Sequence, residues 1–158
     1  MDLDYIIREI REDEYPILSD FLYEAIFIPD GMDKPPKSII ERSQLQVYIA
    51  DFGRADDLCL VAETKDMIIG AVWARIMNDY GHVDDKTPSL AISLYKDHRH
   101  QGIGTALMNA MLGLLRVKGY SKVSLSVQKA NYAVNMYKKA GFETIYENED
   151  EYIMICKL

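Results

Sequence analysis

The residues with the clearest chemical potential lie in the stretch from Arg99 to Met108, which reads RHQGIGTALM. Apolar residues before it alternate as in a strand, and those after it recur every three or four positions, as on the buried face of a helix. A helix start leaves about four backbone N–H groups without intrahelical partners and carries partial positive charge. Gly102 and Gly104 let a ligand approach this backbone closely, and Arg99 adds a full charge. The junction therefore predicts a site for a phosphate or pyrophosphate.

Two common phosphate-binding motifs do not fit this spacing. The dinucleotide motif G-x-G-x-x-G needs a third glycine where Leu107 stands, and the chain has no Walker-type Gly-Lys-Ser/Thr string. A glycine turn without any ligand stays open as an alternative. The pattern that remains, R-x-x-G-x-G entering an amphipathic helix, resembles the acetyl-CoA pyrophosphate loop of the GNAT superfamily of N-acetyltransferases.

A second stretch carries the same resemblance. Members of the family have a helix that ends in Tyr-x-x-x-Gly-Phe just after the fifth strand, and the chain has this ending from Tyr137 to Phe142. Tyr137 matches the tyrosine that the family uses as a general acid toward the departing thiolate. A core aromatic on a helix face is the alternative for this residue. The asparagine position of the family falls on Ala130, so Asn131 stands one residue late as a cofactor contact.

The resemblance implies acetyl-CoA as co-substrate and assigns its contacts. A backbone N–H near the end of the fourth strand, at Leu94 or Tyr95, meets the thioester carbonyl, where the family has a bulge that splays strands four and five. The pantetheine arm lies in that splay, and the N–H groups of residues 101–105 hold the pyrophosphate with Arg99 near them. The complete set of expected cofactor contacts is Leu94, Tyr95, Arg99, His100, Gln101, Gly102, Ile103, Gly104, Thr105 and Asn131.

The general base and the acceptor are less defined. The central strands offer only Ser93, Ser124 and Ser126, and a hydroxyl does not act as a base unaided at neutral pH. A carboxylate such as Glu24, or one from residues 147–151, acting through water stays open, so no base is assigned. By resemblance the acceptor enters between residues 27–38 and 146–152. Their aromatic and acidic character suits a primary amine carried as a cation, either a small amine or a protein amine.

Composition narrows the class of protein. The chain has 158 residues, of which 49% are hydrophobic, so we expect a single domain over residues 1–158. A net charge of -7 without a Lys/Arg-rich run argues against nucleic acid or an anionic membrane as a partner. Cys59 and Cys156 lie in apolar runs and are interpreted as reduced core residues. The three histidines are not at metal-ligand spacing, so no metal is expected. An acidic start at Met1 to Asp4 and the lack of a long apolar run predict a soluble cytoplasmic protein.

The periodicity also predicts the elements that position the site. Strands with apolar residues on one side and small residues on the other suit a central sheet with helices on both faces. Asp13 is expected to cap the first helix, and Ser38 with Glu41 to form a capping box on the second. The expected strands are 5–11, 58–64, 68–77, 89–95, 122–128, 142–146 and 152–156, and the expected helices are 13–26, 38–52, 102–118 and 131–140.

Together these features predict an α/β (α+β) fold similar to that of the GNAT family. It has a mixed, mainly antiparallel sheet of six to seven strands, helices on both faces, and strands four and five splayed. The implied activity is acetyl transfer from acetyl-CoA to a primary amine by direct attack in a ternary complex. A non-catalytic acyl-CoA binding or sensing domain, and a nucleotide- or phosphate-binding module, stay open. Many members of the family dimerise, so a homodimer is open as well.

Overall fold

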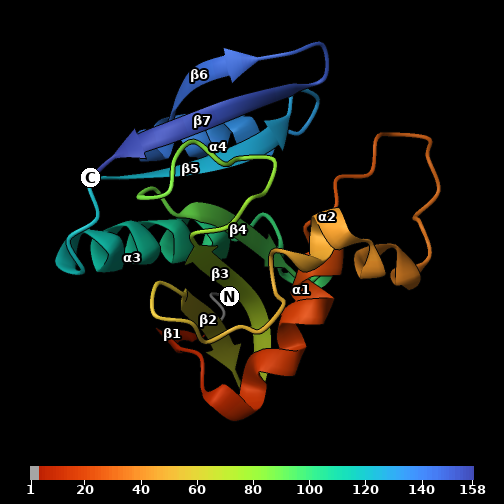
Figure 1. Cartoon of the computed structure of the whole chain (residues 1–158). Coiled ribbons are helices and arrows are strands. Elements are labelled where there is room, and N and C mark those ends of the chain that lie inside the picture. The colour runs from red at the N-terminus through yellow and green to blue at the C-terminus, as the bar shows by residue number, and fades with distance from the viewer. Residues whose placement is uncertain (1–3) are drawn as a thin grey trace.

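The computed structural model describes residues 4–158 and contains one mixed sheet of seven strands with helices on both faces (Figure 1). The strand order is β1-β2-β3-β4-β5-β7-β6, and β4 and β5 are parallel while the other neighbours are antiparallel. This confirms the predicted fold class. Met1, Asp2 and Leu3, part of the acidic start on which the expectation of a soluble cytoplasmic protein rests, lie outside the described residues. The strands are β1 (Ile6–Glu9), β2 (Leu58–Thr64), β3 (Met67–Arg75), β4 (Ser89–Leu94), β5 (Lys122–Gln128), β6 (Glu143–Glu147) and β7 (Glu151–Lys157).

The helices divide between the two faces of the sheet. One face carries α1 and α2, and the other carries α3 and α4 (Figure 1). Within residues 4–158, no helix combines the length and apolar character needed to cross a membrane. The α-helices are α1 (Leu18–Glu24), α2 (Ser43–Gln46), α3 (Ile103–Val117) and α4 (Ala133–Ala140), and the 3₁₀ turns are η1 (Glu12–Ile17), η2 (Lys37–Glu41) and η3 (Lys96–His98).

The central strands supply two separate hydrophobic cores. Because successive side chains of a strand point to opposite faces, β2 sends Leu60 and Ala62 into the core under α3, and Cys59 and Val61 into the core under α1. Cys59 and Cys156 are both buried and free, which confirms their interpretation as core thiols. The sheet is therefore held from both sides, and a single strand serves both cores.

Strands β4 and β5 separate soon after they meet. Their pairing is the bridge between Ser89 and Ser124, and the Ser124 N–H donates to the Pro88 carbonyl at 3.0 Å. The Ser124 hydroxyl donates to the Gly81 carbonyl at 2.7 Å, so the loop before β4 closes this end of the splay. The expected bulge in β4 is wrong, because β4 pairs with β3 through to Leu94 in one continuous register. The divergence of β5 opens the sheet, and no extra residue in β4 is needed.

The first helix begins differently from the prediction. The N-cap of η1 is Arg11 rather than Asp13, and the Glu14 carboxylate accepts the Arg11 N–H at 2.8 Å. The same carboxylate accepts two hydrogen bonds from Arg8 on β1, at 2.9 and 2.8 Å. The hydrogen-bonded Arg8 guanidinium lowers the pKa of Glu14 to about 2. The contact with Arg8 on β1 therefore determines that Glu14 is the capping carboxylate. The spacing of residues along the sequence does not predict this contact.

The second helical segment is broken into two short pieces. Pro36 precedes η2 and no side chain caps this turn, so the capping box of Ser38 and Glu41 is wrong. Arg42 is extended, with ψ of 140°, and ends η2 before α2 begins. The 3₁₀ turn η2 and the four-residue α2 therefore stand in place of the single helix expected over residues 38–52.

A buried ion pair attaches the segment after α2 to the sheet. Arg75, at the end of β3, donates to the two carboxylate oxygens of Asp57 at 3.1 and 2.9 Å. The same guanidinium donates to the Val47 and Ala50 carbonyls at 3.1 and 2.9 Å. The side chains of Arg75 and Asp57 are only 1% and 3% exposed. The planar guanidinium thus satisfies four acceptors from a segment that has little regular structure of its own.

We expect Arg75→Met to lower the free energy of unfolding by about 3–5 kcal/mol, because it leaves the Asp57 charge buried without a partner. Arg54→Met is the matched control, since Arg54 pairs with Asp51 where both side chains are exposed. We expect that control to change the free energy of unfolding by less than about 0.5 kcal/mol. Urea unfolding curves of the three proteins measure both values. Equal losses in the two variants would contradict the anchoring role.

Candidate active site

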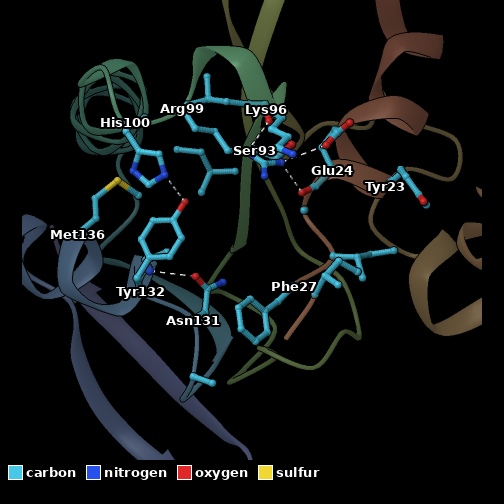
Figure 2. A pocket seen from close by; sticks show the side chains of 18 of the residues that line it. Tyr23, Glu24, Phe27, Ser93, Lys96, Arg99, His100, Asn131, Tyr132 and Met136 are labelled. Atoms are coloured by element: carbon cyan, nitrogen blue, oxygen red, sulfur yellow. Dashed lines mark hydrogen bonds and ion pairs between the residues drawn. The ribbon is translucent and has the colours of Figure 1, made fainter. Parts of the chain in front are cut away.

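A cavity of about 1030 Å³ lies where β4 and β5 diverge (Figure 2). It joins three stretches that are distant in the sequence: 23–35, 92–105 and 130–137. The first stretch contains the end of α1 and the loop that follows it. The second contains the end of β4 and the glycine turn, and the third contains the start of α4. The cavity is therefore built by the long-range topology of the sheet.

The glycine turn presents the start of α3 to this cavity. His100 and Gly102 both have left-handed backbones, with φ of 63° and 83°. A Cβ at Gly102 would meet no atom within 4 Å, so its backbone conformation and not lack of space requires glycine there. Gly104 and Thr105, in the first turn of α3, also line the cavity. The unpaired N–H groups and the partial positive charge of the helix start therefore lie on the cavity wall.

The structure separates the ten expected cofactor contacts into two groups. Three of them do not line the cavity. Tyr95 packs on Phe21, with ring centroids 4.8 Å apart, Gln101 donates to the Asp97 carbonyl at 3.2 Å, and Ile103 is buried in the core. The seven that line the cavity are Leu94, Arg99, His100, Gly102, Gly104, Thr105 and Asn131.

The register of β4 decides which backbone groups face the splay. The Tyr95 N–H donates to the Ile69 carbonyl at 3.0 Å, so Tyr95 directs its polar groups toward β3. Leu94 lies one residue earlier, opposite Gly70, and in an antiparallel pair it directs its N–H and carbonyl to the other side. Of the two amides expected to meet a thioester carbonyl, Leu94 therefore faces the splay and Tyr95 does not.

Arg99 is bound to protein groups on the cavity wall (Figure 2). Its Nε donates to the Leu94 carbonyl at 3.0 Å. One terminal nitrogen, Nη2, donates to the Glu24 carbonyl at 3.3 Å and to the Glu24 carboxylate at 3.0 Å. The guanidinium thus connects the end of β4 with the end of α1. Glu24 was not among the expected site residues in this role, because 75 residues separate it from Arg99.

Tyr137 belongs both to the core and to the cavity wall. It is 9% exposed, packs near Phe142 with ring centroids 6.0 Å apart, and lines the cavity. Burial raises the pKa of its phenol to about 12. The phenol is therefore protonated at neutral pH and able to donate. Full transfer of its proton to an ordinary thiolate would be uphill by roughly 5 kcal/mol.

A contact that the sequence did not reveal spans one side of the cavity. The Tyr132 hydroxyl and His100 Nε2 are 3.3 Å apart, and the two rings are stacked with centroids 5.1 Å apart (Figure 2). Asn131 uses its side-chain oxygen to accept the Ala133 N–H at 2.9 Å, which starts α4. The glycine turn and the start of α4 are therefore tied together.

The candidate bases have defined surroundings. The hydroxyl of Ser93 donates to the Phe21 carbonyl at 2.6 Å, so both this serine and Ser124 are bound to backbone. Residues 147–151 do not line the cavity, whereas Glu24 does. Glu24 is paired with Arg99, and their side chains are 21% and 32% exposed. Of the carboxylates named as candidate bases, the one that lines the cavity, Glu24, is therefore held in an ion pair.

Comparisons with known proteins place this arrangement in a family. A sequence profile described as the acetyltransferase (GNAT) family matches residues 7–142. An N-alpha-acetyltransferase of Sulfurisphaera tokodaii is 30% identical over 113 residues, which cover 62% of this chain and 68% of that protein. N-acetyltransferase family 8 member 3 of Mus musculus is 30% identical over 94 residues. That match covers 59% of this chain but only 42% of the mouse protein.

Solved structures show the same fold. The PaiA N-acetyltransferase from Thermoplasma acidophilum, solved in complex with coenzyme A, has a TM-score of 0.72 and 19% sequence identity. The superposition covers 99% of this chain and 100% of that one. Since the sequence match spans most of the chain and the topology agrees from end to end, the chain belongs to the acetyltransferase (GNAT) family.

Proposed function

We propose that this chain transfers an acetyl group from acetyl-CoA to a primary amine by direct attack in a ternary complex. The observation that carries the proposal is the convergence of three groups on one cavity. The start of α3, the end of β4 at Leu94 and the phenol-bearing Tyr137 all line it. They correspond to the three needs of the reaction: an anion site, a donor for the developing oxyanion and a proton for the thiolate.

The proposed cofactor follows the splay. The N–H groups of residues 101–105, of which Gly102, Gly104 and Thr105 line the cavity, would hold the pyrophosphate at the helix start. A Cβ at Gly102 would meet no atom within 4 Å, so the approach to this glycine is open. The pantetheine arm would lie between β4 and β5, because their divergence leaves backbone groups there for its amides. Asn131 lines the same cavity and would contact the pantetheine arm. The thioester carbonyl would accept the Leu94 N–H.

The proposed reaction starts from the neutral form of the amine, after the ammonium ion has released one proton to water. Its nitrogen forms a bond with the thioester carbon, and the carbonyl electrons move to the oxygen that Leu94 faces. When the carbonyl reforms, the C–S bond breaks and the thiolate takes the proton of Tyr137. The phenolate is reprotonated by the proton that the new amide nitrogen loses, so the products are the acetamide and CoA thiol. The high pKa of Tyr137 requires its proton transfer to be concerted with C–S cleavage.

The proposed acceptor is a small cationic amine or a protein amine. Asp30 lines the cavity on the side of α1, together with the aromatic rings of Tyr23 and Phe27. Carboxylates and aromatic faces both attract a cation. The Tyr23 hydroxyl donates to the Pro35 carbonyl at 2.6 Å, which fixes the two ends of this loop against each other. We propose a cytoplasmic location because both cysteines are free thiols.

Binding of the donor is tested by thermal unfolding. CoA or acetyl-CoA at about 100 times its dissociation constant should stabilise the fold by roughly 2.7 kcal/mol and raise the midpoint by several degrees. ATP and NAD serve as controls at the same concentrations, and we expect smaller shifts with both. A larger shift with ATP or NAD than with CoA would favour a nucleotide-binding module over an acetyltransferase.

Turnover is tested with a panel of amines and thiol release from acetyl-CoA as the readout. We expect cationic amines and peptides with a free α-amine or lysine to react faster than anionic amino acids, because acidic and aromatic groups line the acceptor side. Equal rates with anionic amino acids would contradict the proposed acceptor class. CoA binding without turnover of any amine would favour an acyl-CoA sensing domain.

We expect Tyr137→Phe to lower kcat by about tenfold to a thousandfold, because the variant keeps the ring and removes the only proton that the side chain can donate. The dissociation constant of CoA should change by less than threefold. Tyr80→Phe is the matched control, since Tyr80 is 51% exposed in the loop before β4 and does not line the cavity. Steady-state rates and calorimetric titrations of both variants give these values. An unchanged kcat in Tyr137→Phe would exclude the general-acid role.

A further inference from the structure

We propose that Arg99 is a positioning residue that, with Glu24, holds the open edge of β4 and thereby fixes the direction of the Leu94 N–H. This differs from the expected role of Arg99 as a pyrophosphate contact. The inference rests on the proposed acetyl transfer, because the Leu94 N–H has its catalytic task only in that reaction. The evidence is the set of acceptors that the guanidinium already binds.

The first acceptor is a consequence of the splay. Once β5 leaves β4, the Leu94 carbonyl faces the cavity without a neighbouring strand. A carbonyl that has lost its strand partner needs another donor, because an unpaired buried polar group destabilises the fold. Arg99 Nε supplies that donor at 3.0 Å. The arginine thus takes the place of the missing strand amide.

The second and third acceptors belong to the end of α1. The carbonyls in the last turn of a helix lack intrahelical donors, and Arg99 Nη2 donates to one of them, on Glu24, at 3.3 Å. The same nitrogen donates to the Glu24 carboxylate at 3.0 Å. Two nitrogens of one rigid, planar group are therefore engaged by β4 and α1 together. The guanidinium is held in place from both elements.

A separate contact ties the same two elements. The Ser93 hydroxyl, on the residue before Leu94, donates to the Phe21 carbonyl of α1 at 2.6 Å. Ser93 is 8% exposed, so this contact is largely shielded from water. The N–H and carbonyl of Leu94 lie on the same edge of β4, so fixing the carbonyl also fixes the N–H. An oxyanion donor works only when it is held in place before the charge develops.

The ion pair with Glu24 also makes Arg99 a poor contact for the cofactor phosphates. Glu24 lies within salt-bridge distance of Arg99 and offsets its positive charge. A guanidinium whose donors bind a carboxylate and two carbonyls has fewer free N–H groups and less net charge for a phosphate than an unpaired guanidinium has. The start of α3 and the exposed cation Lys96 on the cavity wall lack such a carboxylate among the ion pairs of the described residues. They suit the cofactor phosphates better.

The test compares two acetyl donors that differ in their phosphates. Acetyl-CoA carries the pyrophosphate, whereas S-acetylpantetheine carries none. For Arg99→Gln we expect kcat/KM to fall by about tenfold to a hundredfold with both donors, and by the same factor within threefold. Arg99→Lys should not restore activity, because an ammonium keeps the charge but loses the planar pair of donors. Glu24→Gln should lower kcat in the same direction while its CoA affinity stays within threefold of the wild type.

Arg116→Gln is the matched control, because Arg116 is exposed in the last turn of α3, away from the cavity. A loss in Arg99→Gln that appears with acetyl-CoA alone, or recovery in Arg99→Lys, would overturn the positioning role. If Arg99→Gln unfolds at a lower temperature than the wild type, Glu24→Gln tests the positioning role with the same two acetyl donors. A wild-type protein that turns over no amine would refute the proposed function instead. In that case CoA titration of Arg99→Gln still tests the inference, and a rise in the dissociation constant beyond threefold overturns it.

Discussion

The parting of two parallel strands after a single bridge is the constraint on which the rest of the structure depends. A parallel sheet normally satisfies every backbone group of its inner strands, and the separation of β4 from β5 withdraws that pairing along one edge. The loop that receives the Ser124 hydroxyl closes one end of the gap. At the other end the backbone must find different partners. Arg99 meets part of that need at the Leu94 carbonyl, and the cofactor we propose would meet another part.

The two cores make such an opening tolerable. Central strands β2, β3 and β4 are packed from both sides, so the sheet does not depend on continuous pairing across its middle. The segment between α2 and β2 has little regular structure, and a buried arginine with four acceptors replaces the missing backbone pairing there. Arg75, opposite Ser89 at the start of β4, and Arg99, bound to Leu94 at the end of β4, thus perform similar tasks at opposite ends of that strand. Each is a forked donor placed where the chain leaves carbonyls unpaired.

Local patterns predicted the elements whose cause is local. The alternation of small and apolar residues predicted β5 at its observed bounds, and the helical spacing predicted α3 to within one residue at each end. Those local patterns do not predict contacts between residues that are distant in the sequence. Glu14 caps a turn because Arg8 holds it from β1, and Arg99 binds Glu24 across 75 residues. The spacing that marked Arg99 was informative, but its partners depend on where α1 ends.

The alternation of β4 has a consequence for how the site can change over evolutionary time. Ser93 faces α1 while Leu94 faces α3, and the polar groups of Leu94 point to the opposite edge from those of Tyr95. An insertion or deletion of one residue within β4 would exchange all of these directions at once. Substitutions in this strand can be accepted one at a time, whereas a change in its length would turn the amide that faces the splay toward β3. The length of β4 is therefore constrained more tightly than the identity of most of its side chains.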